Sequence, residues 1–345
     1  MSSNRIAYTV VDSQEHDLPG HPENPRRFQH FHRLTESPFS EQLLRVEPHE
    51  APVSVVTSIH PPSYLTELEQ AASRGPGFID HGDTYVTPAS YQAALEAAGG
   101  ALNVVNAVID GQARSGFALV RPPGHHTSAT RPSGFCLLNN IAIAARYAQS
   151  RGYPRVMIVD FDVHHGNGTQ ALFEKDPSIL YLSTHQYGIY PGTGSIQETG
   201  LGEGSGSVVN IPLPARAGDQ AFEAITEQVI EPIANRFGPD ILLISAGFDA
   251  HWNDPLASLQ LSTTGYNQLG IALLRMAESL CEGKIVYFLE GGYDPDDLWD
   301  NILAILYSLK RESLPEDRLG PAPFPEISVD DLIETLKSIH GLHSK

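Results

Sequence analysis

Val156-Met-Ile-Val-Asp-Phe-Asp-Val-His-His-Gly-Asn167 is the stretch of sequence that decides the fold of this chain. Its first four residues are apolar without alternation, which is typical of a strand buried on both faces of a sheet. Two carboxylates and two imidazoles follow at once. Because ligands bind beyond the carboxyl ends of parallel strands, the stretch predicts a buried strand that delivers reactive side chains to one sheet edge.

The same pattern recurs along the chain. Further short apolar runs predict strands at Ile6–Val11, Phe117–Val120, Ile179–Leu182, Val208–Ile211, Ile241–Ile244 and Ile285–Leu289. Segments with helical spacing lie between them, most clearly at Ala89–Ile109, Leu138–Ser150, Asp219–Phe237, Thr264–Leu280 and Asp296–Lys310. Strands that alternate with helices predict an α/β fold with three layers, α/β/α, around a mostly parallel sheet.

We expect one domain over residues 1–345, because no linker, repeat or low-complexity tract divides the chain. Its core should span about residues 5–312, and residues 313–345 should form a tail docked on the core with one short helix. Residues 188–207 hold seven glycines. A stretch of that length and composition predicts a long surface loop, which is often functional in compact domains.

Composition narrows the classes of partner. Lys plus Arg is 22 and Asp plus Glu is 41, which gives a net charge of −19. That charge repels nucleic acid and anionic lipid, so we expect neither as a partner. It would attract a cationic partner, or it only keeps the protein soluble; both interpretations stay open.

Cysteine usage and hydropathy indicate the compartment. Cys136 and Cys281 are the two cysteines and lie far apart in sequence, so no disulfide framework is expected and a reducing compartment fits. The first residues have no apolar run of the secretory type, and no run of 18 apolar residues exists. We therefore expect a cytoplasmic protein with no membrane partner.

Four predicted strands end in residues that carry chemistry. They are followed by His125 and His126, by the segment from Asp160 to Asn167, by Asp249 and by Tyr293. Since the carboxyl ends of parallel strands share one edge, these side chains should meet there.

A metal site is the first chemistry that this arrangement predicts. On an extended backbone Asp162 and His164, two positions apart, face the same side, and Asp249 would add a third ligand from another strand end. Three protein ligands with an open position are typical of catalytic zinc. Alone, the Asp-x-His pattern would more often pair or cap a turn, because it is common by chance. The other strand ends favour the metal.

The remaining polar residues suit acid–base chemistry around that metal. Asp160 and Asn167 flank the ligands and would orient His125 and His126, and two histidines with unlike partners can divide base and acid roles. Tyr293 follows two glycines, so its phenol would donate to a developing oxyanion, or it is an ordinary half-buried tyrosine.

These motifs together resemble the histone deacetylase family of the arginase/deacetylase superfamily, over about residues 5–312. The similarity is closer to class II and bacterial members than to class I. The motifs are His21-Pro-Glu-Asn-Pro-Arg26, Arg121-Pro-Pro-Gly-His-His126, Gly134-Phe-Cys-Leu-Leu-Asn-Asn140, the Asp160–Gln170 stretch, Tyr190-Pro-Gly-Thr-Gly194, Ser245-Ala-Gly-Phe-Asp249, Asp254-Pro-Leu256 and Glu290-Gly-Gly-Tyr-Asp294.

The resemblance implies an amidohydrolase that uses one zinc ion to deacetylate acetyl-lysine in a protein or peptide, with hydroxamates as inhibitors. The zinc ligands would be Asp162, His164 and Asp249. The catalytic residues would be His125, His126 and Tyr293, with Asp160 and Asn167 as partners of the histidines. A structural potassium ion would sit among Asp160, Ser183 and Thr184 and the backbone of Asp162 and His164.

The resemblance also places a narrow apolar substrate channel. Its lining would be Gly134, Phe135, Tyr190 and Leu256. Leu256 stands where polyamine-specific relatives carry an acidic residue, which favours acyl-lysine over the alternative, a small-molecule deacylase acting on acetylated polyamines or other acylamines.

His251 and Gly166 stand where the arginase branch has acids that bind a second metal, so we expect that second site to be lost. We expect His251 to lie at the rim of the channel, or else to be a surface histidine.

Overall fold

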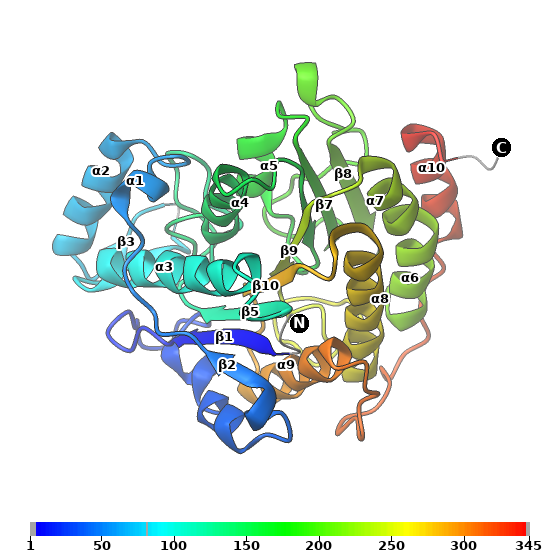
Figure 1. The fold of residues 1–345 in the computed structure, drawn as a ribbon, viewed down its shortest axis with the longest axis horizontal. Helices are drawn as coiled ribbons and strands as arrows, with labels where there is room; N and C mark the ends of the chain where they lie inside the picture. Colours follow the sequence, from blue (N-terminus) through cyan, green and yellow to red (C-terminus); the bar gives the residue numbers. More distant parts are fainter. Residues whose placement is uncertain (1–4, 81, 343–345) are drawn as a thin grey trace.

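An eight-stranded sheet, parallel throughout, forms the middle layer of the computed structural model, which describes residues 5–80 and 82–342 (Figure 1). Its strands, in spatial order, are β2 (Leu43–Arg45), β1 (Ile6–Val11), β5 (Ser115–Val120), β10 (Ile285–Leu289), β9 (Ile241–Ala246), β6 (Val156–Asp160), β7 (Ile179–Gln186) and β8 (Val208–Leu213). A separate antiparallel pair consists of β3 (Gly77–Phe78) and β4 (Tyr85–Val86).

Helices cover both faces of this sheet, and Figure 1 shows α3 and α9 on opposite sides of β5 and β1. One layer contains α1 (Val53–Val56), α2 (Pro62–Ser73), α3 (Ser90–Ile109), α4 (Asn140–Ser150) and α5 (Asn167–Phe173). The other contains α6 (Asp219–Ile225), α7 (Glu231–Phe237), α8 (Thr263–Cys281), α9 (Pro295–Leu309) and α10 (Asp330–His340). Short 3-10 turns lie at Pro25–Phe28, Phe31–Glu36, Ser40–Gln42 and Gly202–Gly204.

The apolar runs form strands because each strand packs on two cores. Successive side chains of a strand point to opposite faces. In β6, Val156 and Ile158 pack in the core below α3 and α4, whereas Met157 and Val159 pack in the core below α8 and α9. The predicted α/β fold with a three-layer arrangement is confirmed.

One predicted helix differs in detail from the structure. The stretch expected as one helix, Asp219–Phe237, consists of α6, a π-helical turn at Thr226–Ile230 and α7. Pro232 lies two residues after that turn and lacks the N–H that a regular helix would use. The wider turn absorbs the interruption, and the chain still covers the same face of the sheet.

The C-terminal segment lies against the second helix layer, where Figure 1 shows α10 beside α6 and α7. The Glu326 carboxylate accepts the backbone N–H groups of Gly218, Gln220 and Ala221 at the start of α6. Leu336 of α10 is fully buried. These contacts hold residues 321–342 on the domain.

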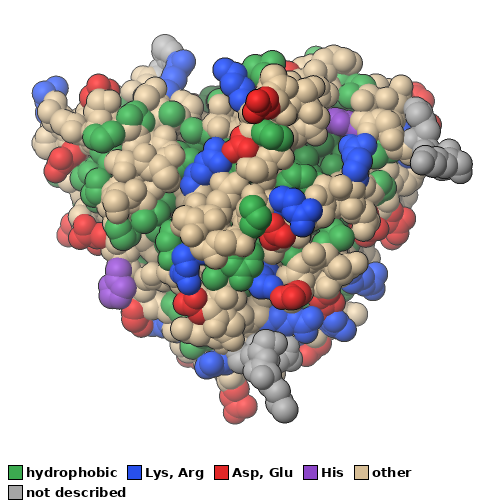
Figure 2. Space-filling view, turned by 45° about the horizontal axis from the view of Figure 1, so that its top comes forward, with side chains coloured by type: hydrophobic (Ala, Val, Ile, Leu, Met, Phe, Trp, Pro, Cys, Tyr) green, Lys and Arg blue, Asp and Glu red, His purple; other side chains and the backbone are tan. Residues whose placement is uncertain are grey.

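Within residues 5–80 and 82–342, no helix combines the length and apolar character needed to cross a bilayer. Cys136 and Cys281 are both buried and unpaired. On the face drawn in Figure 2, Lys and Arg side chains lie interspersed with Asp and Glu side chains. The net charge of −19 is therefore not gathered into one acidic patch on that face.

Candidate active site and metal centre

A pocket of about 230 Å³ opens at the carboxyl ends of the central strands. Its lining residues are Asp83, Pro123, His125, His126, Gly134, Phe135, His164, Tyr190, Leu256, Gly291 and Tyr293. The structure thus brings together both histidines, the tyrosine, one metal-ligand candidate and all four channel candidates from the sequence. A larger hollow of about 910 Å³ lies beside β1 and the first 3-10 turn, and none of the predicted site residues lines it.

Asp162, His164 and Asp249 offer ligand atoms that all lie within 4.8 Å of one another. The Nδ1 atom of His164 is 3.1 Å from Oδ1 of Asp162 and 3.2 Å from Oδ2 of Asp249. Both carboxylates are fully buried. Oδ2 of Asp249 accepts no hydrogen bond among the described residues, and its 3.2 Å contact with Nδ1 of His164 is an ion pair only if that imidazole is protonated. Because a buried carboxylate oxygen without a partner is costly, this trio fits a cation held between its members.

Backbone N–H groups hold the two carboxylates in place. Asp162 accepts the N–H of Gly291 at 2.8 Å and that of His164 at 2.9 Å, and Asp249 accepts the N–H of Val163 at 3.0 Å. The donors come from two different strand ends, so the ligand positions depend on β6, β9 and β10 together. Carboxylates oriented in this way are typical of metal ligands.

The two adjacent histidines have unlike partners. Nδ1 of His125 lies 3.0 Å from Oδ2 of Asp160, and Nδ1 of His126 lies 2.8 Å from Oδ1 of Asn167. Burial opposes a charged His125, but the carboxylates of Asp160 and Asp162 outweigh it and raise its pKa to about 10. Burial and two neighbouring imidazoles hold the pKa of His126 well below its usual value. The pair can therefore hold a proton on one ring and not on the other.

Tyr293 is held from two sides. Its N–H donates to Oδ2 of Asp254 at 2.8 Å, and the guanidinium of Arg27 lies 5.0 Å from its ring centroid. Arg27 also donates to the carbonyl of Gly292 at 2.7 Å. Burial raises the pKa of the Tyr293 phenol well above its ordinary value, so the hydroxyl keeps its proton for donation.

Aromatic rings form the walls of the pocket. Tyr190 stands edge-on to His126 with ring centroids 5.0 Å apart, and Phe135 stands edge-on to Tyr293 at 6.0 Å. Gly134 leaves no room for a side chain, because a Cβ there would lie 2.2 Å from Cδ2 of His126. Leu256, 38% exposed, lines the pocket where it opens.

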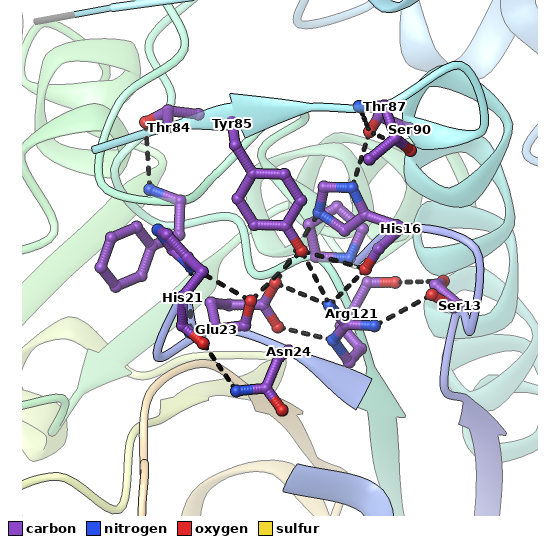
Figure 3. Close-up of polar contacts among 12 residues, drawn as sticks. Ser13, His16, His21, Glu23, Asn24, Thr84, Tyr85, Thr87, Ser90 and Arg121 are labelled. Atoms are coloured by element: carbon purple, nitrogen blue, oxygen red, sulfur yellow. Dashed lines mark hydrogen bonds and ion pairs between the residues drawn. The ribbon is translucent and has the colours of Figure 1, made fainter. Parts of the chain in front are cut away.

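The loop between β1 and the first 3-10 turn supports one wall of the pocket, although sequence reasoning assigned its residues no role. The ring of His21 is edge-on to Phe135 at 4.6 Å, and its Nε2 lies 3.0 Å from the carbonyl oxygen of Asp83. Figure 3 shows the buried carboxylate of Glu23 against the guanidinium of Arg121, with Nε and Oε1 2.6 Å apart.

That loop could have been found from the sequence. The motif His21-Pro-Glu-Asn-Pro-Arg26 is one of those that resemble the family, and a motif of that kind indicates a structural or functional role for its residues. Asp83, which lines the pocket, follows none of the main strands and had no such signal.

The residues expected around potassium lie together beneath the histidines. Asp160 of β6 is the register partner of Ser183 of β7. The hydroxyl of Thr184 is 3.4 Å from the carbonyl oxygen of Asp160, and the hydroxyl of Ser183 is 2.9 Å from Nδ1 of His185. The group offers carbonyl, carboxylate and hydroxyl oxygens, the donors that hard cations prefer.

His251 does not lie at the rim, and it is not a surface histidine. It is 2% exposed, its ring stacks on Trp252, and its Nδ1 is 3.7 Å from Oδ2 of Asp297. The chain turns after Asp249 and pairs His251 with Leu261, which directs the imidazole toward α9. Both expectations from the sequence were wrong because the turn after Asp249 buries the His251 ring against Asp297 of α9.

This chain is similar to known proteins over most of its length. The family model described as the histone deacetylase domain matches residues 21–309. Histone deacetylase 14, chloroplastic, of Arabidopsis thaliana is 41% identical over 360 residues, which cover 98% of this chain and 85% of that protein. A probable deacetylase of Archaeoglobus fulgidus is 41% identical over 278 residues, 80% of this chain and 77% of that protein.

A solved structure is similar over nearly the whole chain. The crystal structure of the HDA15 HD domain matches with a TM-score of 0.85 and 32% identity, covering 97% of this chain and 95% of that one. The two chains therefore share the α/β/α architecture.

Proposed function

Because this chain belongs to the histone deacetylase family and is a hydrolase of amide bonds, we propose that it is a zinc-dependent deacetylase that cleaves acetyl-lysine in proteins or peptides. One observation carries the proposal. A buried group of two carboxylates and an imidazole lies beside the pocket that holds two histidines and a phenol. That combination suits metal-assisted hydrolysis of an amide.

Zinc would be held by Asp162, His164 and Asp249. Two carboxylates and one imidazole with an open position suit catalytic zinc, and the unpartnered oxygen of Asp249 supports a cation there. When bound, zinc supplies a Lewis acid that polarises the acyl carbonyl and makes water more acidic.

The protein's own residues would move the protons. One of His125 and His126 accepts a proton from the attacking water, and the other gives a proton to the departing amine. Their unlike partners, Asp160 and Asn167, support this division of roles. The phenol of Tyr293 donates a hydrogen bond to the oxyanion that develops on the acyl carbonyl. Acetate and the free amine result.

The substrate chain would lie between Phe135 and Tyr190, with Gly134 beneath it and Leu256 at the mouth. Aromatic walls pack against the methylene groups of a lysine side chain and exclude water from the amide. Potassium would bind among Asp160, Ser183 and Thr184, where oxygen donors from β6 and β7 lie side by side.

Metal content and activity together test the assignment. The wild-type protein should contain one zinc ion per chain by mass spectrometry, lose turnover of an acetyl-lysine peptide on chelation and regain it with zinc. Asp249→Ala should lose zinc and activity together, whereas Asp240→Ala, which removes a carboxylate paired with Arg155 at the surface, should keep both. Full turnover by metal-free Asp249→Ala protein would overturn the ligand assignment.

A small-molecule deacylase is the second candidate. Asp83 lines the pocket, and a carboxylate there would attract a cationic acetylated polyamine or a similar amine. Leu256 weighs against a dedicated polyamine enzyme. Values of kcat/KM for acetylated peptides, acetylpolyamines and longer acyl groups would separate the two candidates, and a hydroxamate inhibitor should block either activity.

The cytoplasmic location expected from the sequence stays a prediction, as does the absence of a nucleic-acid partner. Two similar proteins, from Arabidopsis thaliana and Oryza sativa, carry the word chloroplastic in their names. Fractionation of the source cells, followed by detection of the protein in each fraction, tests the compartment directly.

A further inference from the structure

Glu290 is a buried carboxylate that has no part in the proposed proton transfers or in metal binding. It follows β10 directly and is 1% exposed. Among the described residues, its carboxylate pairs with no Lys or Arg side chain, and the buried guanidinium groups of Arg27 and Arg121 form their ion pairs with Glu23 instead. A carboxylate persists in such a place only if hydrogen bonds replace its water. The hydrogen-bond donors to the Glu290 carboxylate therefore indicate its structural role.

The donors come from the loop that carries the two histidines. Oε2 of Glu290 accepts the backbone N–H of Gly124 at 2.7 Å and that of His125 at 3.2 Å. Oε1 accepts the hydroxyl of Ser245, at the end of β9, at 2.9 Å. One carboxylate thus ties the loop after β5 to the ends of β9 and β10.

The loop has no free space on its other side. A Cβ at Gly124 would lie 2.5 Å from the backbone nitrogen of Asn140, at the start of α4. The loop is therefore clamped between α4 and the Glu290 carboxylate. Any change in the length of the residue at 290 should move the loop, because α4 blocks it in one direction.

The backbone at Glu290 connects the same clamp to the rest of the site. Its carbonyl accepts a hydrogen bond from Arg27 at 2.6 Å, and the N–H of the next residue, Gly291, donates to Asp162 at 2.8 Å. The tandem histidines, the candidate metal ligand and the loop of Tyr293 are all fastened at this point.

We propose that Glu290 is a positioning residue whose carboxylate sets the distance between the tandem-histidine loop and the metal trio. The proposal rests on the proposed function, since distance matters only if these groups act on one substrate. It concerns geometry and not charge. Glutamine has the same reach, can accept both N–H groups with its amide oxygen, and can donate its NH₂ to the Ser245 oxygen. Aspartate keeps the charge but is shorter by one methylene.

The variants Glu290→Gln, Glu290→Asp and Glu290→Ala separate these properties. We expect kcat on an acetyl-lysine peptide to fall roughly 10–100-fold in the Ala and Asp variants, with KM within about twofold of wild type. The Gln variant should stay within a few-fold of wild type. Zinc content should be unchanged in all three.

Amide hydrogen exchange gives a readout that needs no activity. Exchange at Gly124 and His125 should be faster in the Ala and Asp variants and near the wild-type rate in Gln. Glu326→Ala is the matched control, because the Glu326 carboxylate also accepts backbone N–H groups, three of them at the start of α6 and none in the pocket. It should leave kcat and exchange at both amides unchanged.

Either of two results would overturn the positioning role: a Gln variant as impaired as Ala, or unchanged exchange at Gly124 and His125 in the Asp variant. If the Ala variant fails to fold, the comparison of Gln with Asp still decides. A wild-type protein that cleaves no acetylated amine would instead refute the proposed function, and the exchange data would still decide the role of Glu290.

Discussion

Replacement of Gly134 by alanine should show how the position of His126, a proposed catalytic residue, affects turnover independently of the stability of the fold. The new Cβ would meet Cδ2 of His126 at 2.2 Å, whereas ordinary contact begins at 3.4 Å, so the ring must retreat by about 1.2 Å. It cannot do so freely, because Asn167 holds its Nδ1 at 2.8 Å.

The size of the effect follows from that displacement. A shift of about 1 Å in a reacting group costs on the order of 10²-fold in rate, or about 2.7 kcal/mol in activation free energy. Gly134 also has a φ of +55°, where an alanine costs about 1–2 kcal/mol of stability. We therefore expect a kcat about 100-fold lower and a modest fall in the free energy of unfolding.

Gly111→Ala is the matched control. Gly111 has a φ of +71°, and no atom lies within 4 Å of the point where a Cβ would stand, so it carries the same backbone cost without the collision. Steady-state kinetics and urea unfolding of both variants give the comparison. A Gly134→Ala enzyme with kcat within about twofold of wild type, or equal kcat losses in both variants, would refute the reasoning.

Three further predictions concern other parts of the molecule. Tyr293→Phe should lower kcat by roughly 10²–10³ while the melting temperature stays unchanged; an unchanged kcat would remove the phenol from the mechanism. Leu256→Glu adds a carboxylate near Asp83 and should raise kcat/KM for acetylpolyamines relative to an acetyl-lysine peptide, measured as the ratio of the two. Burial lowers the pKa of His60 to about 4, and its Nε2 accepts the N–H of Asn139 at 2.9 Å. The unfolded chain therefore binds the proton first as pH falls below about 6.5, which costs about 2 kcal/mol of stability by pH 5; urea unfolding of His60→Gln should lack this part of the pH dependence.

Local sequence patterns predicted the strands well where both faces of the sheet are buried. β1 and β10 have the predicted bounds, and five other strands extend the predicted runs by one to four residues. Such strands can be recognised in the sequence because residues on both faces of the strand are buried, which gives a continuous apolar run. β2 gave no signal, since its three residues at the edge of the sheet are at least partly exposed.

Spacing along one strand end also placed part of the site. Asp162 and His164 lie side by side as the two-residue spacing predicts. The supporting contacts were beyond such reasoning, because His21 reaches Phe135 and Glu290 reaches Gly124 only through the folded chain. The position of His251 was predicted wrongly for a similar reason. The turn that pairs His251 with Leu261 decides where its ring lies, and that turn is formed only in the folded chain.

The place of β10 in the sheet has a consequence for assembly. It is the last strand along the chain, yet it lies in the middle of the sheet, between β5 and β9. Without β10 the sheet would divide into one strip of β2, β1 and β5 and another of β9, β6, β7 and β8, and β5 and β9 would each have an unpaired edge, which favours wrong pairing. The tandem histidines follow a strand of the first strip, and the candidate metal ligands follow strands of the second. Pairing of β10 with both β5 and β9 is therefore what joins the two halves of the candidate site, and Tyr293 follows the end of the same strand.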